Sequence, residues 1–386
     1  MHTKSTRRIP MSIKSVTAKT VFDELDQGQP IVILDLRAPS EFEDWRIAGP
    51  HPAKFYNIFY ADFFENEEAA AAPLPKDQEI TIVCAKGGAS ATVAEILDQL
   101  GYQVRHMEGG MLAWSQLHIV RPVPVASEEF KIWQVNRVGK GCLSYVVAAH
   151  GEGLIVDPSR MTHVYQDLAQ QEGFRIRYVV DTHIHADHIS GGRELAHAAG
   201  ATYRLTETHA GAPLRYEPLN DKEVLSLGDV RVETLTIHTP GHTPESTSFL
   251  INDQYLISGD TVFVEGVGRP DLGGNTAKWA QDLFESIHVR LAGLRNDTWV
   301  LPAHYQSMDE IKEHRLVFTT FGHLRKTDKI KRNLSAQQFI RDIVNDNSPP
   351  PPNYEKIVDA NMGRIDLDVD TANFLEIGPN RCALVH

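Results

Sequence analysis

The first third of the chain alternates short strand-like apolar runs with segments of helical spacing. The runs cover residues 30–36, 79–83 and 103–106. Residues 91–100 carry apolar side chains at helical spacing and stop at Gly101, a residue that suits the end of a helix. A shorter helical segment covers residues 111–117. Strands that alternate with helices predict an α/β domain with a parallel sheet.

From about residue 130 onward, strand-like runs follow one another more closely. They cover residues 130–135, 143–149, 153–156, 175–180, 230–237, 246–251 and 254–257. Helical patterns at residues 161–171 and 189–199 stand on either side of the run at 175–180. Hairpins combined with helices predict a second domain of the α+β class.

The two patterns meet in residues 118–128, a stretch with two prolines and little helical period. Such a composition predicts extended chain. We expect a first domain over residues 11–120, a linker over 121–128, a second domain over 129–360 and a C-terminal tail over 361–386. Two domains also suit a length of 386 residues, which exceeds what one typical core fills.

The composition limits the classes of binding partner and the cellular compartment that we expect. The formal net charge of −13 disfavours nucleic acid and anionic membranes as partners, because both repel an acidic protein. Three cysteines, Cys84, Cys142 and Cys382, are too few for a disulfide framework, so we expect a reducing, cytoplasmic location. No stretch approaches the roughly 18 apolar residues of a membrane span, and the basic first residues lack the apolar core of a signal peptide.

The segment Thr182-His-Ile-His-Ala-Asp-His188 concentrates metal-binding side chains on one short loop. The loop joins a predicted strand to a predicted helix, and further candidates follow later apolar runs. The full set is His183, His185, Asp187, His188, His242, Asp260 and His304. A lone histidine usually packs or is solvated, but this many candidates at strand ends predict a metal site. Imidazoles and carboxylates suit zinc, iron or copper.

In this order, the motifs resemble the metallo-β-lactamase superfamily over roughly residues 128–360. The motifs after the first are Thr239-Pro-Gly-His242, Ser258-Gly-Asp260 and Leu301-Pro-Ala-His304. The resemblance implies an αβ/βα sandwich of two mixed sheets with the metal at one edge. Within the superfamily, Gly266-Val-Gly-Arg-Pro-Asp-Leu-Gly-Gly274 and Pro349-Pro-Pro-Pro-Asn-Tyr-Glu-Lys-Ile-Val358 resemble persulfide dioxygenases.

The resemblance to persulfide dioxygenases implies one Fe(II) per chain, held by His183, His242 and Asp260, with open positions for substrate and O2. The other candidates would orient ligands and water or hold a second metal, and they are His185, Asp187, His188 and His304. Because all the ligands of a binuclear hydrolase site are present, a glyoxalase II-like thioesterase with two Zn is the alternative. Zinc supplies a bound hydroxide for hydrolysis but does not activate O2.

Arg269 and Tyr305 are candidates for substrate contact. Arg269 belongs to the Gly-Arg-Pro-Asp passage, where an ion pair with Asp271 is the alternative role. Tyr305 ends Pro302-Ala-His-Tyr305, whereas many persulfide dioxygenases have Pro-Ala-His-Asp-Tyr. The missing aspartate moves the tyrosine by one position, which prevents a direct transfer of thiol contacts from the family.

The loop Val83-Cys-Ala-Lys-Gly-Gly-Ala-Ser90 places a thiol between a predicted strand and a predicted helix. Its candidate catalytic residues are Cys84, Lys86, Gly87, Gly88 and Ser90. The glycines let the backbone turn tightly and direct N–H groups inward. The amides, the helix start and the lysine charge favour a thiolate, which suits a sulfur nucleophile. Cys142, in contrast, fits a buried structural cysteine.

Residues 11–120 resemble a rhodanese, or sulfurtransferase, domain. The matching passages are Leu34-Asp-Leu-Arg37, Glu41-Phe42, Trp45-Arg-Ile-Ala-Gly49 and Glu108-Gly-Gly-Met-Leu-Ala-Trp114. The resemblance implies that Cys84 is a nucleophile that carries sulfane sulfur as a persulfide. Arg46 stands where histidine is usual and Ala89 where arginine is usual, so a non-catalytic binding or dimerising module is a further hypothesis.

Together the two resemblances imply a bifunctional enzyme of sulfane-sulfur metabolism. The second domain would convert a low-molecular-weight thiol persulfide, O2 and water into sulfite and free thiol. The first would move sulfur through a Cys84 persulfide, forming thiosulfate or running in reverse. The carrier thiol stays open between glutathione, coenzyme A and another thiol, and the superfamily implies a homo-oligomer.

Overall fold

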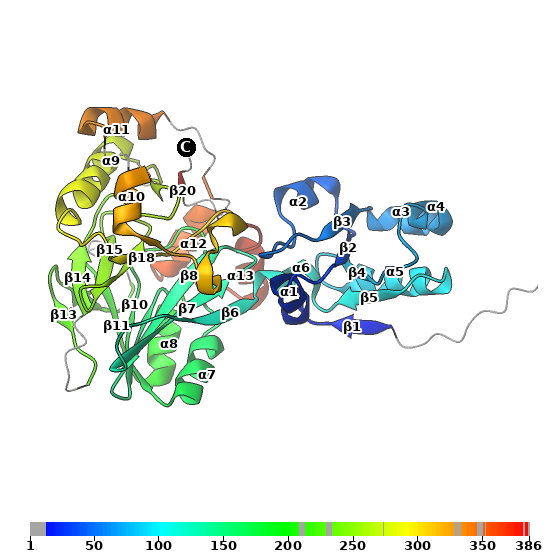
Figure 1. The fold of residues 1–386 in the computed structure, drawn as a ribbon, viewed down its shortest axis with the longest axis horizontal. Coiled ribbons are helices and arrows are strands. Elements are labelled where there is room, and N and C mark those ends of the chain that lie inside the picture. The colour runs from blue at the N-terminus through cyan, green and yellow to red at the C-terminus, as the bar shows by residue number, and fades with distance from the viewer. Residues whose placement is uncertain are drawn as a thin grey trace, which may run out of the picture. The chain divides into compact units, whose positions relative to one another are not determined.

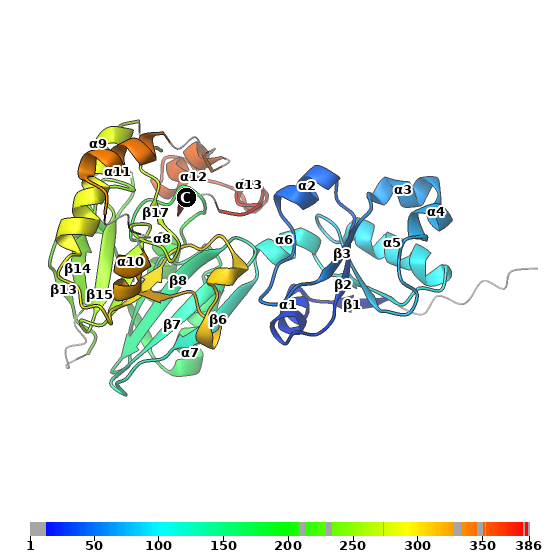
Figure 2. The same cartoon turned by 45° about the horizontal axis from the view of Figure 1, so that its top comes forward.

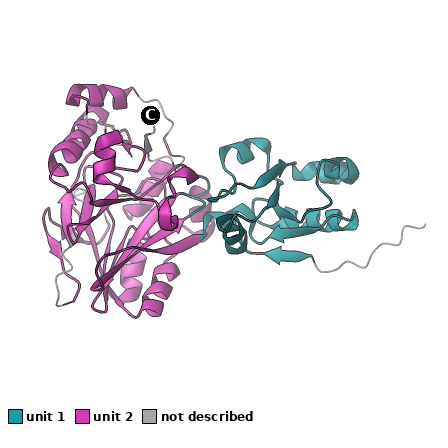
Figure 3. Cartoon of the chain, in the orientation of Figure 1, with its two compact units in different colours: residues 1–117, 138–140, 377–379 teal, residues 118–137, 141–376, 380–386 magenta. Residues whose placement is uncertain are grey.

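The computed structural model divides into two compact units (Figure 3). The described residues are 13–207, 213–228, 234–272, 274–327, 330, 333–345, 350–351, 353–380 and 383–384. Unit 1 comprises residues 1–117, 138–140 and 377–379, and unit 2 comprises residues 118–137, 141–376 and 380–386. Within the described residues, no helix is long and apolar enough to cross a bilayer.

Unit 1 is built on a sheet whose described strands all run parallel, which confirms the predicted α/β class (Figure 1). The strands are β1 Lys14–Val16, β2 Val32–Asp35, β3 Lys54–Asn57, β4 Ile80–Val83 and β5 Val104–Met107. Their order across the sheet is β1-β5-β4-β2-β3. The central strands β2 and β4 are buried along their whole length, as expected when helices cover both faces of a parallel sheet.

Helices lie on both faces of the unit 1 sheet (Figure 2). They are α1 Ala18–Asp26, α2 Pro39–Asp44, α3 Tyr60–Glu65, α4 Glu67–Ala71, α5 Gly88–Gln99 and α6 Gly110–Ser115. Val93 and Leu97 of α5 share a core with Phe63 of α3. Helices α1 and α6 lie on the opposite face (Figure 2). The rings of Phe22 in α1 and Trp114 in α6 are 6.3 Å apart. Helix α5 starts directly after the Cys84 loop. The strand that carries this loop, β4, is therefore packed between helices on both faces of the sheet.

Unit 2 contains two mixed sheets (Figure 1). The strands of the first are β6 His118–Val123, β7 Phe130–Arg137, β8 Cys142–Ala149, β9 Glu152–Val156, β10 Arg175–Val180, β11 Thr202–Thr206 and β12 Glu217–Leu219. Those of the second are β13 Val224–Leu225, β14 Thr234–His238, β15 Thr247–Ile251, β16 Tyr255–Gly259, β18 Trp299–Pro302 and β19 Thr319–Thr320. In the described part, the orders are β12-β11-β10-β9-β8-β7-β6 and β13-β14-β15-β16-β18-β19.

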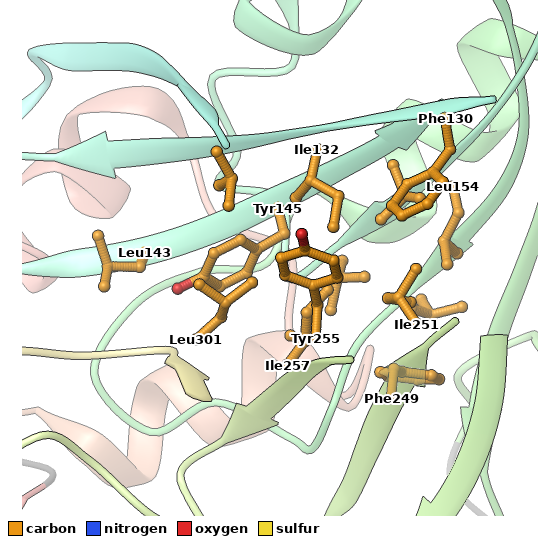
Figure 4. Close-up of a cluster of buried hydrophobic side chains, with 14 of the residues drawn as sticks. Phe130, Ile132, Leu143, Tyr145, Leu154, Phe249, Ile251, Tyr255, Ile257 and Leu301 are labelled. Carbon is orange, nitrogen blue, oxygen red and sulfur yellow. The ribbon is translucent and has the colours of Figure 1, made fainter. Parts of the chain in front are cut away.

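The main core of unit 2 lies between these sheets (Figure 4). Ile132 and Tyr145 of the first sheet and Phe249 and Ile257 of the second are buried in it. The first sheet packs its other face on α7 His163–Glu172 and α8 Gly192–Ala199. The second packs on α9 Thr276–Glu285, α10 Phe321–Thr327 and α11 Ala336–Val344. These layers form the αβ/βα sandwich that the sequence motifs imply.

The prediction of a linker over residues 121–128 is wrong for residues 121–123. Residues 118–123 form β6, which pairs antiparallel with β7 from His118↔Arg137 to Val123↔Ile132. Pro122 lacks an N–H group, but β6 is the edge strand of its sheet, where a missing donor is tolerated. Pro122 therefore marks a sheet edge rather than a free connection.

The structure of residues 361–386 also differs from the predicted tail, because much of this segment packs into unit 2. Helix α12 Tyr354–Asn361 runs into it, and α13 Val369–Leu375 follows. Strand β20 Ala383–Leu384 pairs antiparallel with β17 Val267–Gly268. These elements are too short to give a clear sequence period. Pro349, Pro352 and Cys382 lie outside the described residues.

Candidate metal centre and thiol loop

The ligand loop joins β10 to α8, as the sequence predicts. Buried carboxylates that lie next to the ends of other strands hold its first half. Asp157 accepts the backbone N–H of Thr182 at 2.6 Å, and Glu245 accepts that of Ile184 at 2.9 Å. Both acids are at most 2% exposed, so these charge-assisted hydrogen bonds are shielded from water. The backbone that carries the histidines is therefore fixed by the fold.

Two residues from the C-terminal segment hold the second half of the ligand loop. Nδ2 of Asn361 donates to the carbonyl oxygens of His185 and His188, both at 2.8 Å. A carboxylate oxygen of Glu376 accepts the backbone N–H of Ile189 at 2.8 Å. The segment that the sequence left without a role thus supports the metal-binding loop.

His183, His242 and Asp260 come together in a buried group, each just after a strand. Oδ2 of Asp260 lies 3.4 Å from Nε2 of His242 and 3.8 Å from Nε2 of His183. Bonds of about 2.1 Å to one ion put neighbouring ligand atoms roughly 3–4 Å apart. The spacing of this group therefore fits a single metal ion.

The hydrogen bonds of the two histidines direct their Nε2 atoms to this group. Nδ1 of His242 donates to the carbonyl oxygen of Arg269 at 2.8 Å, and Nδ1 of His183 lies 2.9 Å from Oγ1 of Thr182. Among the described residues, Nε2 of His183 and Oδ2 of Asp260 are buried without a hydrogen-bond partner. Such atoms are costly to bury unless a cation binds them, so the residues fit a metal ion.

The electrostatics of the group suit metal binding as well. Burial, aided by the imidazole of His185, holds the pKa of His183 well below its usual value. Burial alone would raise the pKa of Asp260, but the imidazoles of His304 and His242 outweigh it and hold that pKa below its usual value. Neutral imidazole and ionised carboxylate are the forms that bind a metal.

The remaining histidine and aspartate candidates fall into two neighbouring groups. In the first, Asp187 accepts from Nε2 of His304 at 3.0 Å, Nδ1 of His188 at 3.1 Å and the thiol of Cys142 at 3.0 Å. Nδ1 of His304 lies 2.7 Å from Oδ1 of Asp260. We call Cys142, Asp187, His188 and His304 the second cluster, and His304 joins it to the three-ligand group.

His185 belongs to a separate group with Asp157 and Asp181. Its Nε2 lies 3.2 Å from Oδ1 of Asp157 and 3.7 Å from Oδ1 of Asp181. Burial would lower the pKa of His185, but these carboxylates outweigh it and raise that pKa well above its usual value. The structure thus turns this nitrogen toward carboxylates, although the ring centroid lies only 4.3 Å from that of His183.

The two candidates for substrate contact are both buried. Nε and Nη2 of Arg269 each lie 2.7 Å from an oxygen of Asp271, which is the ion pair foreseen as the alternative role. The Tyr305 hydroxyl donates to Oδ1 of Asn136 at 3.2 Å, and its ring lies in the core between the sheets. Contact of either side chain with substrate stays a prediction, whereas the backbone of Arg269 touches His242 directly.

In unit 1, Cys84 follows β4 and is 5% exposed. Its Sγ accepts from the backbone N–H groups of Gly87 at 3.1 Å and Ser90 at 3.3 Å. The Ser90 hydroxyl donates to the Gly87 carbonyl at 3.0 Å, which ties the loop to the first turn of α5. Lys86 on this loop and Gly88, the first residue of α5, are exposed. The predicted amide cradle around the sulfur is therefore present.

The glycine pair of the Glu108-Gly-Gly passage closes the other side of the thiol loop. Gly110 has a φ of +56°, and a Cβ there would lie 2.1 Å from the carbonyl oxygen of Cys84. The backbone N–H of Met111 donates to that oxygen at 2.8 Å. Close backbone contact explains why this position requires glycine.

Sequence reasoning missed several residues at the metal centre, and they are Asp157, Asp181, Glu245, Asn361 and Glu376. It also assigned Cys142 a purely structural role, although its thiol contacts Asp187. Asp157 and Asp181 directly follow β9 and β10, and a polar residue at a buried strand end was the available signal. The other three gave no local signal.

Two protein-family models match parts of this chain. The model of the Metallo-beta-lactamase superfamily matches residues 137–304, and that of the Rhodanese-like domain matches residues 17–117. The mitochondrial persulfide dioxygenase ETHE1 of Mus musculus is 30% identical over 213 residues, which cover 55% of this chain and 78% of that protein. The chain belongs to the metallo-beta-lactamase superfamily. Its unit 2 is the superfamily domain, and a rhodanese-like domain precedes it.

Other members of the metallo-beta-lactamase superfamily are similar too. A hydroxyacylglutathione hydrolase of Anaeromyxobacter dehalogenans is 34% identical over 165 residues, which cover 42% of this chain and 62% of that protein. The solved structure of a metallo-beta-lactamase from Staphylococcus aureus has a TM-score of 0.55 and 26% identity, covering 62% of this chain and 74% of that chain. The superfamily domain therefore resembles both dioxygenases and hydrolases.

Proposed function

We propose that unit 2 is an Fe(II)-dependent persulfide dioxygenase. It oxidises the outer sulfur of a low-molecular-weight thiol persulfide such as glutathione persulfide, so that R–S–SH, O2 and water give R–SH, sulfite and protons. The observation that carries this proposal is the group of His183, His242 and Asp260, in which two buried ligand atoms have no other partner among the described residues. Two imidazoles and a carboxylate are the donor set of non-haem Fe(II) oxygenases.

A ferrous ion in this group would supply the activation of O2. The residues of the chain prepare its ligands. The carbonyl of Arg269 fixes the tautomer of His242, and His304 holds Oδ1 of Asp260 so that Oδ2 faces the metal position. The burial of all three ligands limits access of bulk water, which favours encounter of persulfide and O2 over side reactions.

The similarity to a persulfide dioxygenase supports the same reaction, and one passage gives it a physical basis. The Gly266–Gly274 segment, which resembles persulfide dioxygenases, contains Arg269, whose carbonyl holds a metal-site histidine. The segment therefore acts on the geometry of the metal centre rather than being a distant marker of ancestry.

In this proposal, unit 1 transfers sulfane sulfur through Cys84. A persulfide R–S–SH passes its outer sulfur to the Cys84 thiol, which leaves R–SH and a Cys84 persulfide. Sulfite then takes that sulfur, which gives thiosulfate and restores the thiol, and the reverse direction uses the same contacts. The amides of Gly87 and Ser90 stabilise negative charge on the sulfur during both steps.

A zinc-dependent thioester hydrolase is the second candidate for unit 2. The observation that favours it is the second cluster, which lies beside the three-ligand group and adds the side chains that a binuclear site needs. The similarity to a hydroxyacylglutathione hydrolase, at 34% identity, favours it as well. Zinc would supply Lewis-acid chemistry and a nucleophile for hydrolysis of a glutathione thioester.

Oxygen uptake with glutathione persulfide distinguishes these candidates. The iron-loaded protein is expected to consume O2 and form sulfite, and His183→Ala is expected to lose this activity. His197→Ala, which changes an exposed histidine of α8, serves as the matched control and keeps it. Equal uptake by the parent and His183→Ala would refute the assignment, and hydrolysis of S-lactoylglutathione without O2 would establish the hydrolase.

Thiosulfate formation from persulfide and sulfite tests unit 1 separately. Cys84→Ser is expected to abolish this transfer and leave O2 uptake intact. Thr92→Ala, a change at an exposed position of α5, is the control. If Cys84→Ser and the parent transfer sulfur at the same rate, unit 1 is a non-catalytic module instead.

A further inference from the structure

Cys142 is placed at the metal centre by its backbone. It is the first residue of β8 and forms an isolated antiparallel β-bridge with His304, which follows β18 of the other sheet. Next to it, the N–H of Leu143 donates to the carbonyl of Ala303 at 2.7 Å. The thiol is 7% exposed, so its position and its contacts are set by the fold.

The second cluster is held together by hydrogen bonds that converge on Asp187. Oδ2 of Asp187 accepts from the thiol of Cys142 and from Nε2 of His304, each at 3.0 Å. Oδ1 lies 3.1 Å from Nδ1 of His188. Both oxygens of the carboxylate are therefore engaged within the protein.

The second cluster contrasts with the three-ligand group beside it. In the three-ligand group, Nε2 of His183 and Oδ2 of Asp260 are buried without a partner among the described residues. In the second cluster, no nitrogen or oxygen of Asp187, His188 or His304 is in this condition within the described part of the chain. Yet the donor atoms of the second cluster lie within 4.8 Å of one another, close enough to bind an ion.

We infer that Cys142 is a positioning residue that keeps the second cluster from taking up a second metal ion. It donates to the Asp187 oxygen that a second ion would need as a ligand, and its sulfur lies within 4.8 Å of the imidazole nitrogens that such an ion would also need. The cluster then serves as a scaffold that orients His304 and, through it, Asp260. This inference rests on the one-metal part of the proposed function and names the residue that limits the metal count.

The competing role for the same residue is ligation. As a thiolate, Cys142 would join two imidazoles and a carboxylate in a four-donor set that suits zinc. The two roles predict opposite results when the sulfur is removed. A scaffold thiol keeps the count at one ion and its removal raises the count, whereas a thiolate ligand binds the second ion and its removal lowers the count.

Metal stoichiometry of metal-free protein reconstituted with excess Co2+ tests the inference, with elemental analysis and the cobalt spectrum as readouts. The parent and Cys142→Ser, which keeps a donor to Asp187, are expected to bind one cobalt per chain. Cys142→Ala, which removes both the donor and the sulfur, is expected to bind two. The parent is expected to lack a sulfur-to-cobalt charge-transfer band from Cys142, so its spectrum should match that of Cys142→Ser. This comparison does not depend on how Cys142→Ala folds.

The outcomes separate this inference from the proposed function. One cobalt in the parent and one in Cys142→Ala would overturn the inference alone and leave the dioxygenase intact. Two cobalt ions in the parent would overturn both. A sulfur-to-cobalt band in the parent that disappears in Cys142→Ser would overturn the inference in favour of ligation.

Discussion

Nδ1 of His242 donates a hydrogen bond to the carbonyl oxygen of Arg269 at 2.8 Å. This bond ties a metal-site histidine to the Gly266–Gly274 segment, and the Arg269 side chain in turn is paired with Asp271 through two hydrogen bonds of 2.7 Å. Arg269 is 1% exposed. An ion pair between the buried Arg269 and the partly exposed Asp271 thus supports the backbone carbonyl that sets the tautomer of His242.

Asp271→Ala is expected to lower the free energy of unfolding by about 1–3 kcal/mol, because it removes two charge-assisted hydrogen bonds from a buried guanidinium. It is also expected to weaken metal binding. Asp297→Ala is the control, since the Arg295–Asp297 pair has the same sequence spacing and two similar hydrogen bonds but is exposed. The prediction fails if denaturant titration shows that the two variants lose the same stability.

His304→Ala is expected to weaken metal binding by roughly 10- to 100-fold, because Oδ1 of Asp260 loses the donor that orients it. His304→Asn keeps an N–H group near the position of Nδ1 and is expected to retain part of that affinity. Competition with a chelator measures both, with the exposed His197→Ala as the control. Unchanged affinity in His304→Ala would show that His304 does not orient Asp260.

Glu376 links stability to pH. Burial alone would raise its pKa, but Arg137 and Arg160, with the N–H of Ile189, lower the pKa from 4.5 to about 2. A depressed carboxyl pKa contributes stability above the unfolded value, and the contribution disappears as pH falls from about 4.5 to about 2. A shift of this size corresponds to about 3 kcal/mol.

Glu376→Gln is therefore expected to destabilise metal-free protein at pH 7 by up to about 3 kcal/mol, with the difference from the parent shrinking as pH falls toward 2. Denaturant titrations at several pH values measure this. Glu355→Gln, at an exposed position of α12, is the control and should change little. A difference that stays constant with pH would mean that the charge of Glu376 is not the cause.

Gly110→Ala is expected to abolish sulfur transfer by unit 1 and spare O2 uptake by unit 2. A Cβ at Gly110 would lie 2.1 Å from the carbonyl oxygen of Cys84, so the thiol loop must move. Gly101→Ala is the matched control, because Gly101 also has a positive φ, of +84°, but no atom lies within 4 Å of its Cβ position. Equal loss in both variants would assign the effect to backbone strain rather than to the loop.

The metal ligands could be predicted from sequence because they follow strands, and strand ends of one domain meet at a common edge. The thiol loop could be predicted because its glycines, its cysteine and the start of α5 are neighbours in the chain. Both sites are encoded by local sequence patterns that can be recognised without knowledge of the fold.

The support of the metal centre could not be predicted in this way. Glu245 contacts the ligand loop across 61 residues and Glu376 across 187, and neither belongs to a motif. Part of strand β6 was predicted to be a linker because a proline fits a strand only at a sheet edge, and the edge position of β6 is known only from the fold. Cys142 lies in an apolar strand, so its polar contact to Asp187 appears only when β8 is placed beside His304.

The most direct test of the central claim is the metal content of protein purified without O2, combined with O2 uptake on glutathione persulfide. The account predicts one iron per chain, bound by His183, His242 and Asp260, and O2 consumption that yields sulfite. Two zinc ions per chain, no O2 consumption and hydrolysis of a glutathione thioester would contradict it.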